Sequence, residues 1–213
     1  MICVTVCKQS IQQPMSDVLP TLKSIFPMHL HDEAKAIAEI IPFTEYAPGY
    51  DPIIRTVKVG DSAVKLLYRI YNPVVDSEIF SQQLNETQRN MLCCFYTRHC
   101  DGYVREHYLY YLFNLDQDWV APFVFQLVGE YVIEIIAIIN NASEQLLAKN
   151  SYKQFIKDNP EFMALLEQRV ISYWNCYYRR CSDPDIPYYY DRLKYPGMQF
   201  IKDCKVVSHF GNK

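Results

Sequence analysis

"GEYVIEIIAII", residues 129–139, places Glu130 and Glu134 four positions apart in a strongly apolar part of the chain. Together with the residues from Trp119 onward, this run is nearly long enough to cross a bilayer. On a helix the two glutamates share one narrow polar stripe, while valines and isoleucines cover the opposite side. Each acidic residue near a bilayer centre would cost about 2.5–3.5 kcal/mol. We therefore expect one long packing helix over about residues 119–140, at the centre of a helical domain, and no membrane span.

A carboxylate metal site is the second interpretation of the same glutamates, and the neighbouring residues do not support it. Di-iron helical bundles need a histidine three positions after a glutamate, and neither glutamate has one. The eight cysteines include no C-x-x-C pair, which removes the main support for a zinc ribbon. We expect no metal and no cofactor. A metal- or thiol-dependent enzyme built on Cys93, Cys94, His99 and Cys100 stays open as an alternative.

The spacing of the glycines argues against the common catalytic loops. The chain has six glycines, and no two of them are closer than eleven residues. The dinucleotide fingerprint, the phosphate-binding loop and the nucleophile elbow all need glycines nearer to each other. We therefore predict that the protein is not an enzyme.

The composition indicates a folded protein without a general attraction for nucleic acid. Half of the 213 residues are hydrophobic, 15% are aromatic, and the formal net charge is −3. A chain of this length can bury the core of one domain, and its negative charge gives no bulk attraction to phosphate. No basic segment precedes the apolar residues 2–7, and the cysteine spacing is irregular. We therefore expect a cytoplasmic protein with reduced thiols.

Periodicity and turn residues divide the expected single domain into four parts. Gly60-Asp61 lies between two β-branched or aromatic runs, which predicts a β-hairpin. Asn85 with Gln88 three residues later indicates a capping box at a helix start. The parts are two short helices broken by Pro27 with a connector (1–52), the hairpin near 53–71 (within 53–76), a helical core (85–181) and an irregular aromatic tail (182–213).

Within the core, "DGYVREHYLYYL" resembles the first helix of a HEAT-type repeat, in which an Asp precedes Val-Arg and small or apolar positions follow. The matching positions are Asp101, Val104, Arg105, Leu109 and Leu112. Tyr108 departs from the pattern, because a small residue is usual there. The resemblance covers about residues 85–141 and implies an antiparallel pair of helices, the second one starting near Trp119.

The helix pair predicts a partner for the glutamates. Arg105 lies about as far before the "DQD" turn as Glu130 lies after it, so the two side chains reach similar heights along antiparallel helices. We expect a partly buried ion pair between Arg105 and Glu130 or Glu134. Removing one partner should destabilise the protein, and removing both should restore much of the loss.

The C-terminal third carries the residues expected to bind another molecule. Tyrosines, a tryptophan and arginines alternate there, a composition that suits either base stacking or a protein interface. Nearby aspartates dilute the positive charge, so we favour a protein partner over nucleic acid. The predicted protein-binding residues are Glu130, Glu134, Arg179, Arg180, Tyr188, Tyr189 and Tyr190.

The sequence therefore predicts a mainly α domain with a HEAT-like helix pair at its centre, acting as a non-catalytic protein-binding module of the cytosol. An immunity protein that neutralises a toxin is the first alternative. A metal- or thiol-dependent enzyme is the second.

Overall fold

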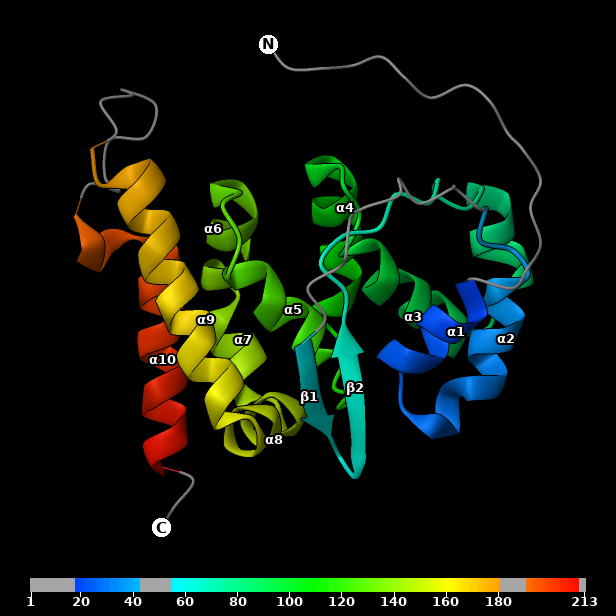
Figure 1. The fold of residues 1–213 in the computed structure, drawn as a ribbon, viewed down its shortest axis with the longest axis horizontal. Coiled ribbons are helices and arrows are strands. Elements are labelled where there is room, and N and C mark those ends of the chain that lie inside the picture. The colour runs from blue at the N-terminus through cyan, green and yellow to red at the C-terminus, as the bar shows by residue number, and fades with distance from the viewer. Residues whose placement is uncertain (1–17, 43–54, 181–190, 211–213) are drawn as a thin grey trace.

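The computed structural model describes residues 18–42, 55–180 and 191–210, and it shows helices set around one small hairpin (Figure 1). The α-helices are α1 (Val18–Ile25), α2 (His31–Ala38), α3 (Glu86–Tyr96), α4 (Gly102–Leu112), α5 (Ala121–Val128), α6 (Ile133–Asn141), α7 (Ser143–Ala148), α8 (Asn150–Asp158), α9 (Pro160–Tyr173) and α10 (Pro196–Phe210). Single turns of other helix types are η1 (Met28–Leu30), η2 (Ile79–Gln83), η3 (Trp174–Tyr178) and η4 (Arg192–Lys194), and the strands are β1 (Arg55–Val59) and β2 (Ser62–Leu66). The prediction of a mainly α fold with a small hairpin is confirmed.

The hairpin forms where the sequence predicts it. β1 and β2 pair antiparallel, and Val59 faces Ser62 across the two-residue loop Gly60-Asp61. Gly60 has φ 55°, the left-handed conformation that such tight hairpin loops require. Val57 and Val64 face each other and are both buried, so one face of the hairpin packs on the helices.

The outer edge of β1 is closed by a side chain from the helical core. The backbone N–H of Lys58 donates to Asn159 Oδ1 at 2.7 Å, and Asn159 Nδ2 donates back to the Lys58 carbonyl at 2.9 Å. Asn159 Nδ2 also donates to the carbonyl of Phe155 in α8. Asn159 stands at the N-cap position of α9, but its side-chain amide does not cap the helix. It forms instead the pair of backbone hydrogen bonds that a neighbouring strand would make with β1.

The first two helices also follow the prediction. α1 ends at Ile25 and α2 begins at His31, with Pro27 between them. Just after α1, the ring of Phe26 packs against Trp119 and Phe123 at centroid distances of 5.7 and 5.6 Å. The N-terminal helices are thereby joined to the middle of the molecule.

Side chains cap the two helices that follow the hairpin. Asn85 and Gln88 form the expected capping box at the start of α3. At the start of α4, a side-chain oxygen of Asp101 accepts from the backbone N–H of Tyr103 at 2.8 Å. Residues within three positions of each N-terminus therefore determine where α3 and α4 begin.

The single long helix expected over residues 119–140 is wrong, because the chain breaks between α5 and α6 at residues 129–132. α9 passes close to Gly129: a Cβ built there would lie 2.7 Å from Leu166 Cδ1. The freed carbonyl of Gly129 accepts from Arg169 Nε at 3.0 Å, and that of Tyr131 accepts from the Tyr178 hydroxyl at 2.6 Å. The break removes the common polar stripe, so Glu130 turns inward and Glu134 is exposed on α6.

The irregular tail expected over residues 182–213 is also wrong in its described part. α10 occupies residues 196–210 and packs against α6, α7, α8 and α9. Its Phe200, Ile201 and Cys204 are buried. Because Phe200 and Ile201 lie four and three positions before Cys204, α10 presents one apolar face to the other helices.

Buried apolar side chains from Val18 in α1 to Cys204 in α10 form one core cluster. Near its middle the rings of Phe125 and Phe155 stack at 5.2 Å, and Phe200 reaches Phe125 from α10. Within the described ranges, every helix is too short or too polar to cross a membrane.

Candidate protein-interaction site

Glu130 lies at the centre of a buried charged cluster. Its two carboxylate oxygens accept from Nη1 and Nη2 of Arg69, each at 2.8 Å. Arg98 Nη2 donates to Oε1 at 2.5 Å, and Arg105 Nε lies 3.4 Å from Oε2. All four side chains are at most 8% exposed. We refer to these four residues as the Glu130 cluster.

The same arginines bind backbone carbonyls and so join distant parts of the chain. Arg98 Nε donates to the carbonyl of Leu67 at 3.0 Å, and Arg98 Nη2 donates to that of Tyr68 at 2.8 Å. Arg105 Nη1 donates to the carbonyls of His99 and Cys100. The cluster therefore fixes the segment after β2, the end of α3, α4 and the break after α5 to one another.

The electrostatics of the cluster favour an ionised carboxylate. Burial alone would raise the pKa of Glu130, but the guanidiniums of Arg98, Arg69 and Arg105 outweigh it and hold the pKa below its ordinary value. Burial lowers the pKa of Arg98 to about 10 against the attraction of Glu130, so Arg98 remains protonated at neutral pH. Burial also lowers the pKa of Arg105. Within the described residues, three guanidiniums thus share one buried carboxylate.

The expected ion pair between Arg105 and Glu130 is present, and it is one of three contacts that Glu130 makes with arginines. Glu134 lies in the first turn of α6 and is exposed. Sequence reasoning missed Arg69 and Arg98. A signal existed: each is the one arginine in an apolar or uncharged run, "LLYRIY" and "CCFYTRHC", much as Glu130 and Glu134 are the only charged residues from Trp119 to Ile139.

A surface of tyrosines and arginines lies at the end of α9, beside the break. Tyr131 packs against Tyr173 and Tyr177 at centroid distances of 6.2 and 6.0 Å, and Tyr173 stacks on Tyr177 at 6.0 Å. Tyr131 is 47% exposed and Tyr177 is 56% exposed. We name the tyrosine–arginine surface by its members: Tyr131, Arg169, Tyr173, Tyr177, Arg179 and Arg180.

One arginine contacts these rings, and two more follow them along the chain. Arg169 lies over the ring of Tyr173, 5.9 Å from its centroid. Arg179 and Arg180 follow η3 directly and are exposed, with Arg179 Nη1 donating to Asn175 Oδ1 at 3.0 Å. Of the predicted binding residues, Arg179 and Arg180 belong to this surface. Tyr188, Tyr189 and Tyr190 lie outside the described residues.

A second aromatic site, which we name the α4 groove, runs between α4 and η2. It has a volume of about 780 Å³. Phe80 contacts Tyr108 and Tyr111 at centroid distances of 6.0 Å, and His107 contacts Tyr111 at 5.5 Å. The remaining lining residues are Val74, Val75, Ser77, Ser81, Arg89, Tyr103 and Val104. No sequence pattern that we used pointed to this groove.

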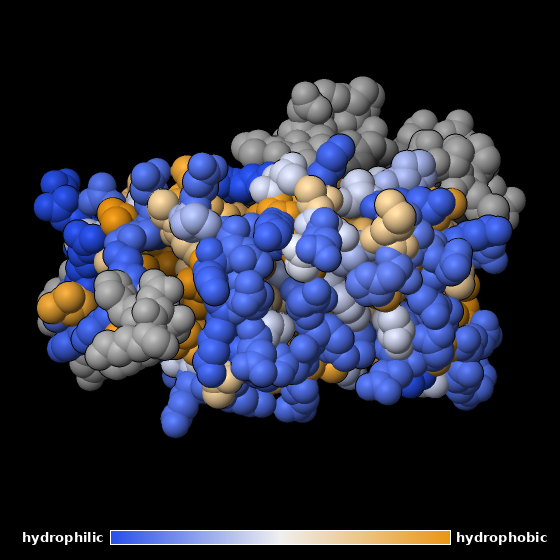
Figure 2. All heavy atoms as spheres, turned by 90° about the horizontal axis from the view of Figure 1, so that it is seen from below, coloured by the Kyte–Doolittle hydropathy of each residue, from blue (hydrophilic) through white to orange (hydrophobic). Residues whose placement is uncertain are grey.

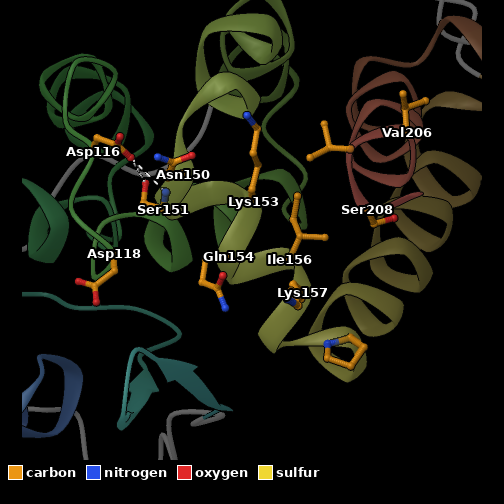
Figure 3. Close-up of a pocket in the computed structure, with 12 residues that line it drawn as sticks. Asp116, Asp118, Asn150, Ser151, Lys153, Gln154, Ile156, Lys157, Val206 and Ser208 are labelled. Carbon is orange, nitrogen blue, oxygen red and sulfur yellow. Dashed lines mark hydrogen bonds between the residues drawn. The ribbon is translucent and has the colours of Figure 1, made fainter. Parts of the chain in front are cut away.

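A third hollow, of about 1200 Å³, is lined by α8, the end of α10 and the turn before α5 (Figure 3). Asp116 accepts from both the backbone N–H and the hydroxyl of Ser151, at 3.1 and 2.6 Å. The hydroxyl hydrogen bond, followed by the backbone one, lowers the pKa of Asp116, and the carboxylate caps α8 from outside that helix. The Ser208 hydroxyl donates to the Lys205 carbonyl in its own helix. Both hydroxyls are engaged in helix contacts, that of Ser151 with Asp116 and that of Ser208 with a carbonyl of its own helix.

The molecular face that carries the hairpin tip and α8 is mostly hydrophilic, with hydrophobic side chains scattered over it (Figure 2). Figure 1 places α4 and the end of α9 on the opposite side. The exposed aromatic rings described above are therefore concentrated away from this polar face.

Among the described residues, Cys93, Cys94, His99 and Cys100 differ in burial and do not form a metal-binding group. Cys93 and Cys94 are buried, and Cys100 is exposed. His99 Nδ1 accepts the backbone N–H of Asp101 at 3.0 Å, while Cys100 Sγ lies 4.0 Å from it. In the described parts of the chain, no three His, Cys, Asp or Glu side chains are grouped so that they could hold a metal ion.

Comparison with family models, curated proteins and solved structures finds no match for this chain. The resemblance of residues 85–141 to a HEAT-type repeat therefore stays a prediction.

Proposed function

We propose that the protein is a non-catalytic protein-binding module of the cytosol and that its tyrosine–arginine surface contacts the partner. The observation that carries this proposal is the stack of Tyr131, Tyr173 and Tyr177, two of which are about half exposed, with arginines on its flank. Tyrosine and arginine are, with tryptophan, the residues enriched among the anchors of protein interfaces.

The Glu130 cluster supports the proposal because it lies directly behind this surface. Glu130 and Tyr131 are adjacent, so fixing the glutamate by three arginines also fixes the backbone that presents the tyrosine. The hydrogen bond of Tyr178 to the Tyr131 carbonyl and that of Arg169 to the Gly129 carbonyl hold the same loop from α9 and η3. A surface held in place before binding loses less entropy when a partner docks.

The charges of the surface indicate what the partner presents. Arg179 and Arg180 are exposed and follow Tyr177 by two and three residues, so a partner surface that carries carboxylates fits best. Glu134 lies in the first turn of α6, three residues after Tyr131, and it weakens the attraction of this surface for a phosphate backbone. A protein is therefore a better partner than nucleic acid. A toxin neutralised by an immunity protein is one such partner.

The described thiols are consistent with action in the cytosol. Cys93, Cys94, Cys100, Cys176 and Cys204 are all free. Burial raises the pKa of Cys93 to about 12 and keeps its thiol protonated. Three of these thiols are buried and two are exposed, and free thiols of both kinds are usual in a reducing compartment.

The proposal is tested by quantitative pull-down from the native host after nuclease treatment. The bait variant combines Tyr177→Ser with Arg179→Ser, and the matched control combines Tyr110→Ser with Lys153→Ser, which are exposed residues outside the surface. We expect a protein that wild type and control enrich equally and that the surface variant enriches at least about tenfold less. A partner retained by the surface variant, or one that nuclease removes, contradicts the proposal.

A further inference from the structure

Two half-buried arginines, Arg55 and Arg169, interact with each other although neither forms an ion pair with a described carboxylate. Arg55 is the first residue of β1, which begins at the end of the hairpin far from its tip, toward the side on which α9 ends (Figure 1). Burial, followed by repulsion from Arg169, lowers the pKa of Arg55. Nε of Arg55 is buried and has no hydrogen-bond partner in the described part of the chain. Two like charges with an unused donor favour a bound anion.

The Glu130 cluster lies beside this pair and does not neutralise it. Arg169 Nε donates to the carbonyl of Gly129, the residue before Glu130. The carboxylate of Glu130 is already shared by three other guanidiniums. Even so, the buried Nη1 of Arg98, a side chain that is 1% exposed, has no hydrogen-bond partner among the described residues. The positive charge of this region therefore exceeds what its own carboxylate can balance.

Two further carboxylates lie near this region, and each has another place in the structure. Asp101 caps α4, and its charge acts on Arg105, where it opposes the lowering of the pKa by burial. Glu134 is exposed in the first turn of α6 and forms no ion pair with a described residue. A carboxylate of another molecule is therefore the group that fits Arg55 and Arg169.

The stacked tyrosines supply an apolar contact next to these charges. Arg169 lies over the ring of Tyr173, 5.9 Å from its centroid, and Tyr173 packs against Tyr131 and Tyr177. Tyr131 and Tyr177 are about half exposed. An apolar side chain can pack on these rings while a neighbouring carboxylate reaches the guanidiniums.

We propose that the partner of the tyrosine–arginine surface inserts a carboxylate between Arg55 and Arg169 and packs an adjacent apolar side chain on Tyr131 and Tyr177. This inference rests on the proposed function, since it specifies which chemical group of that partner the surface recognises. Arg55 then belongs to the binding surface although β1 is far from α9 in the sequence.

The test begins with selection from a random peptide library displayed on phage. Wild-type protein is the target, and an excess of soluble Arg55→Gln variant is the competitor that removes peptides binding without this arginine. The side chain of Arg55 makes no hydrogen bond among the described residues, so the variant should fold as wild type does. We expect the enriched peptides to carry an aspartate or glutamate next to a leucine, phenylalanine or tryptophan. Basic peptides, or no peptide that distinguishes wild type from the competitor, would overturn the proposal.

Affinity measurements on the selected peptide then identify the contact. Arg55→Gln should weaken binding at least about tenfold. Lys58→Gln removes one positive charge from an exposed position of the same strand and should change binding by less than about twofold. Replacing the acidic residue of the peptide by its amide should weaken binding as Arg55→Gln does, and the two changes together should cost little more than either alone. Losses that add would show that the acidic residue does not contact Arg55 and would overturn the proposal.

Failure of this inference and failure of the proposed function give different results. A peptide that is weakened by Tyr177→Ser but not by Arg55→Gln would leave the tyrosine–arginine surface as a protein-binding site and overturn the role of Arg55. A peptide that is weakened by neither change would bind outside the surface and contradict both proposals.

Discussion

At the scale of single residues, Glu130 determines how the middle of the molecule is held together. Its carboxylate is shared by Arg69, Arg98 and Arg105, which come from three different segments. Buried ion pairs of this kind contribute little net stability, but breaking one by removing a single partner is costly. The cluster therefore specifies the arrangement of the chain more than it adds to its stability.

The first prediction concerns substitutions in this cluster. Glu130→Gln leaves three buried guanidiniums without their counter-charge and should lower the unfolding free energy by about 3–5 kcal/mol. Arg105→Met should cost less, because Arg69 and Arg98 still pair with Glu130. The double variant should remain about as unstable as Glu130→Gln alone, which corrects the expectation of a restored pair. Urea unfolding at pH 7 measures the unfolding free energy of all three variants. A double variant with an unfolding free energy close to that of wild type would contradict the sharing of Glu130 by three arginines.

The second prediction follows from the lowered pKa of Glu130. Burial opposes ionisation but Arg98, Arg69 and Arg105 prevail, so the folded pKa lies below the ordinary 4.5. A carboxylate with a depressed folded pKa stabilises the protein above its unfolded pKa, and this contribution is lost as the pH falls through the folded pKa. The difference in unfolding free energy between wild type and Glu130→Gln should thus be constant near neutrality. Below pH 4.5 it should shrink by up to about 1.4 kcal/mol per pH unit. A difference that grows in acid would contradict the assignment.

At the scale of elements, the features that depend on neighbouring residues could be predicted and those that depend on distant ones could not. Gly60-Asp61 specifies its hairpin, and Asn85 with Gln88 specifies the start of α3, each within a few residues. The break after Gly129 depends on Leu166, whose side chain needs the space a Cβ would fill, and on Arg69, 61 residues away from Glu130. Periodicity along one helix contains no information about such contacts.

α10 was missed for a different reason. Pro196 followed by Gly197 indicates a turn, yet proline is also favoured in the first turn of a helix. The apolar spacing of Phe200, Cys204 and Val207 was the available signal for that helix. Of the candidate site, the sequence pointed to Arg179 and Arg180 and to the pair Arg105–Glu130. It did not point to Tyr131, because that tyrosine joins Tyr173 and Tyr177 only through the fold.

The third prediction concerns the attachment of the hairpin to the helices. Asn159→Ala removes both hydrogen bonds to the Lys58 backbone and the bond to the Phe155 carbonyl. It should therefore lower the unfolding free energy by about 1–3 kcal/mol. Asn150→Ala, an exposed asparagine at the start of α8, is the matched control and should stay within about 0.5 kcal/mol. Thermal unfolding of both variants provides the comparison. Equal stability of the two would show that the hairpin does not depend on Asn159.

At the scale of the whole molecule, the aromatic surfaces and the polar face lie on different sides. The face with the hairpin tip and α8 is mostly hydrophilic (Figure 2), and the tyrosine–arginine surface and the α4 groove are formed by elements on the opposite side. This distribution is what a binding module needs, because it directs partners to defined sites.

The central claim is that the tyrosine–arginine surface contacts another protein in the cell. Photo-crosslinking in the native host tests it most directly, with a photoreactive phenylalanine analogue placed at Tyr177 and, as a control, at Lys153 on the polar face. We predict a discrete protein adduct at position 177 that is absent at position 153 and is lost when Arg179→Ser and Arg180→Ser are added. The same adducts at both positions, or none at position 177, would contradict the claim.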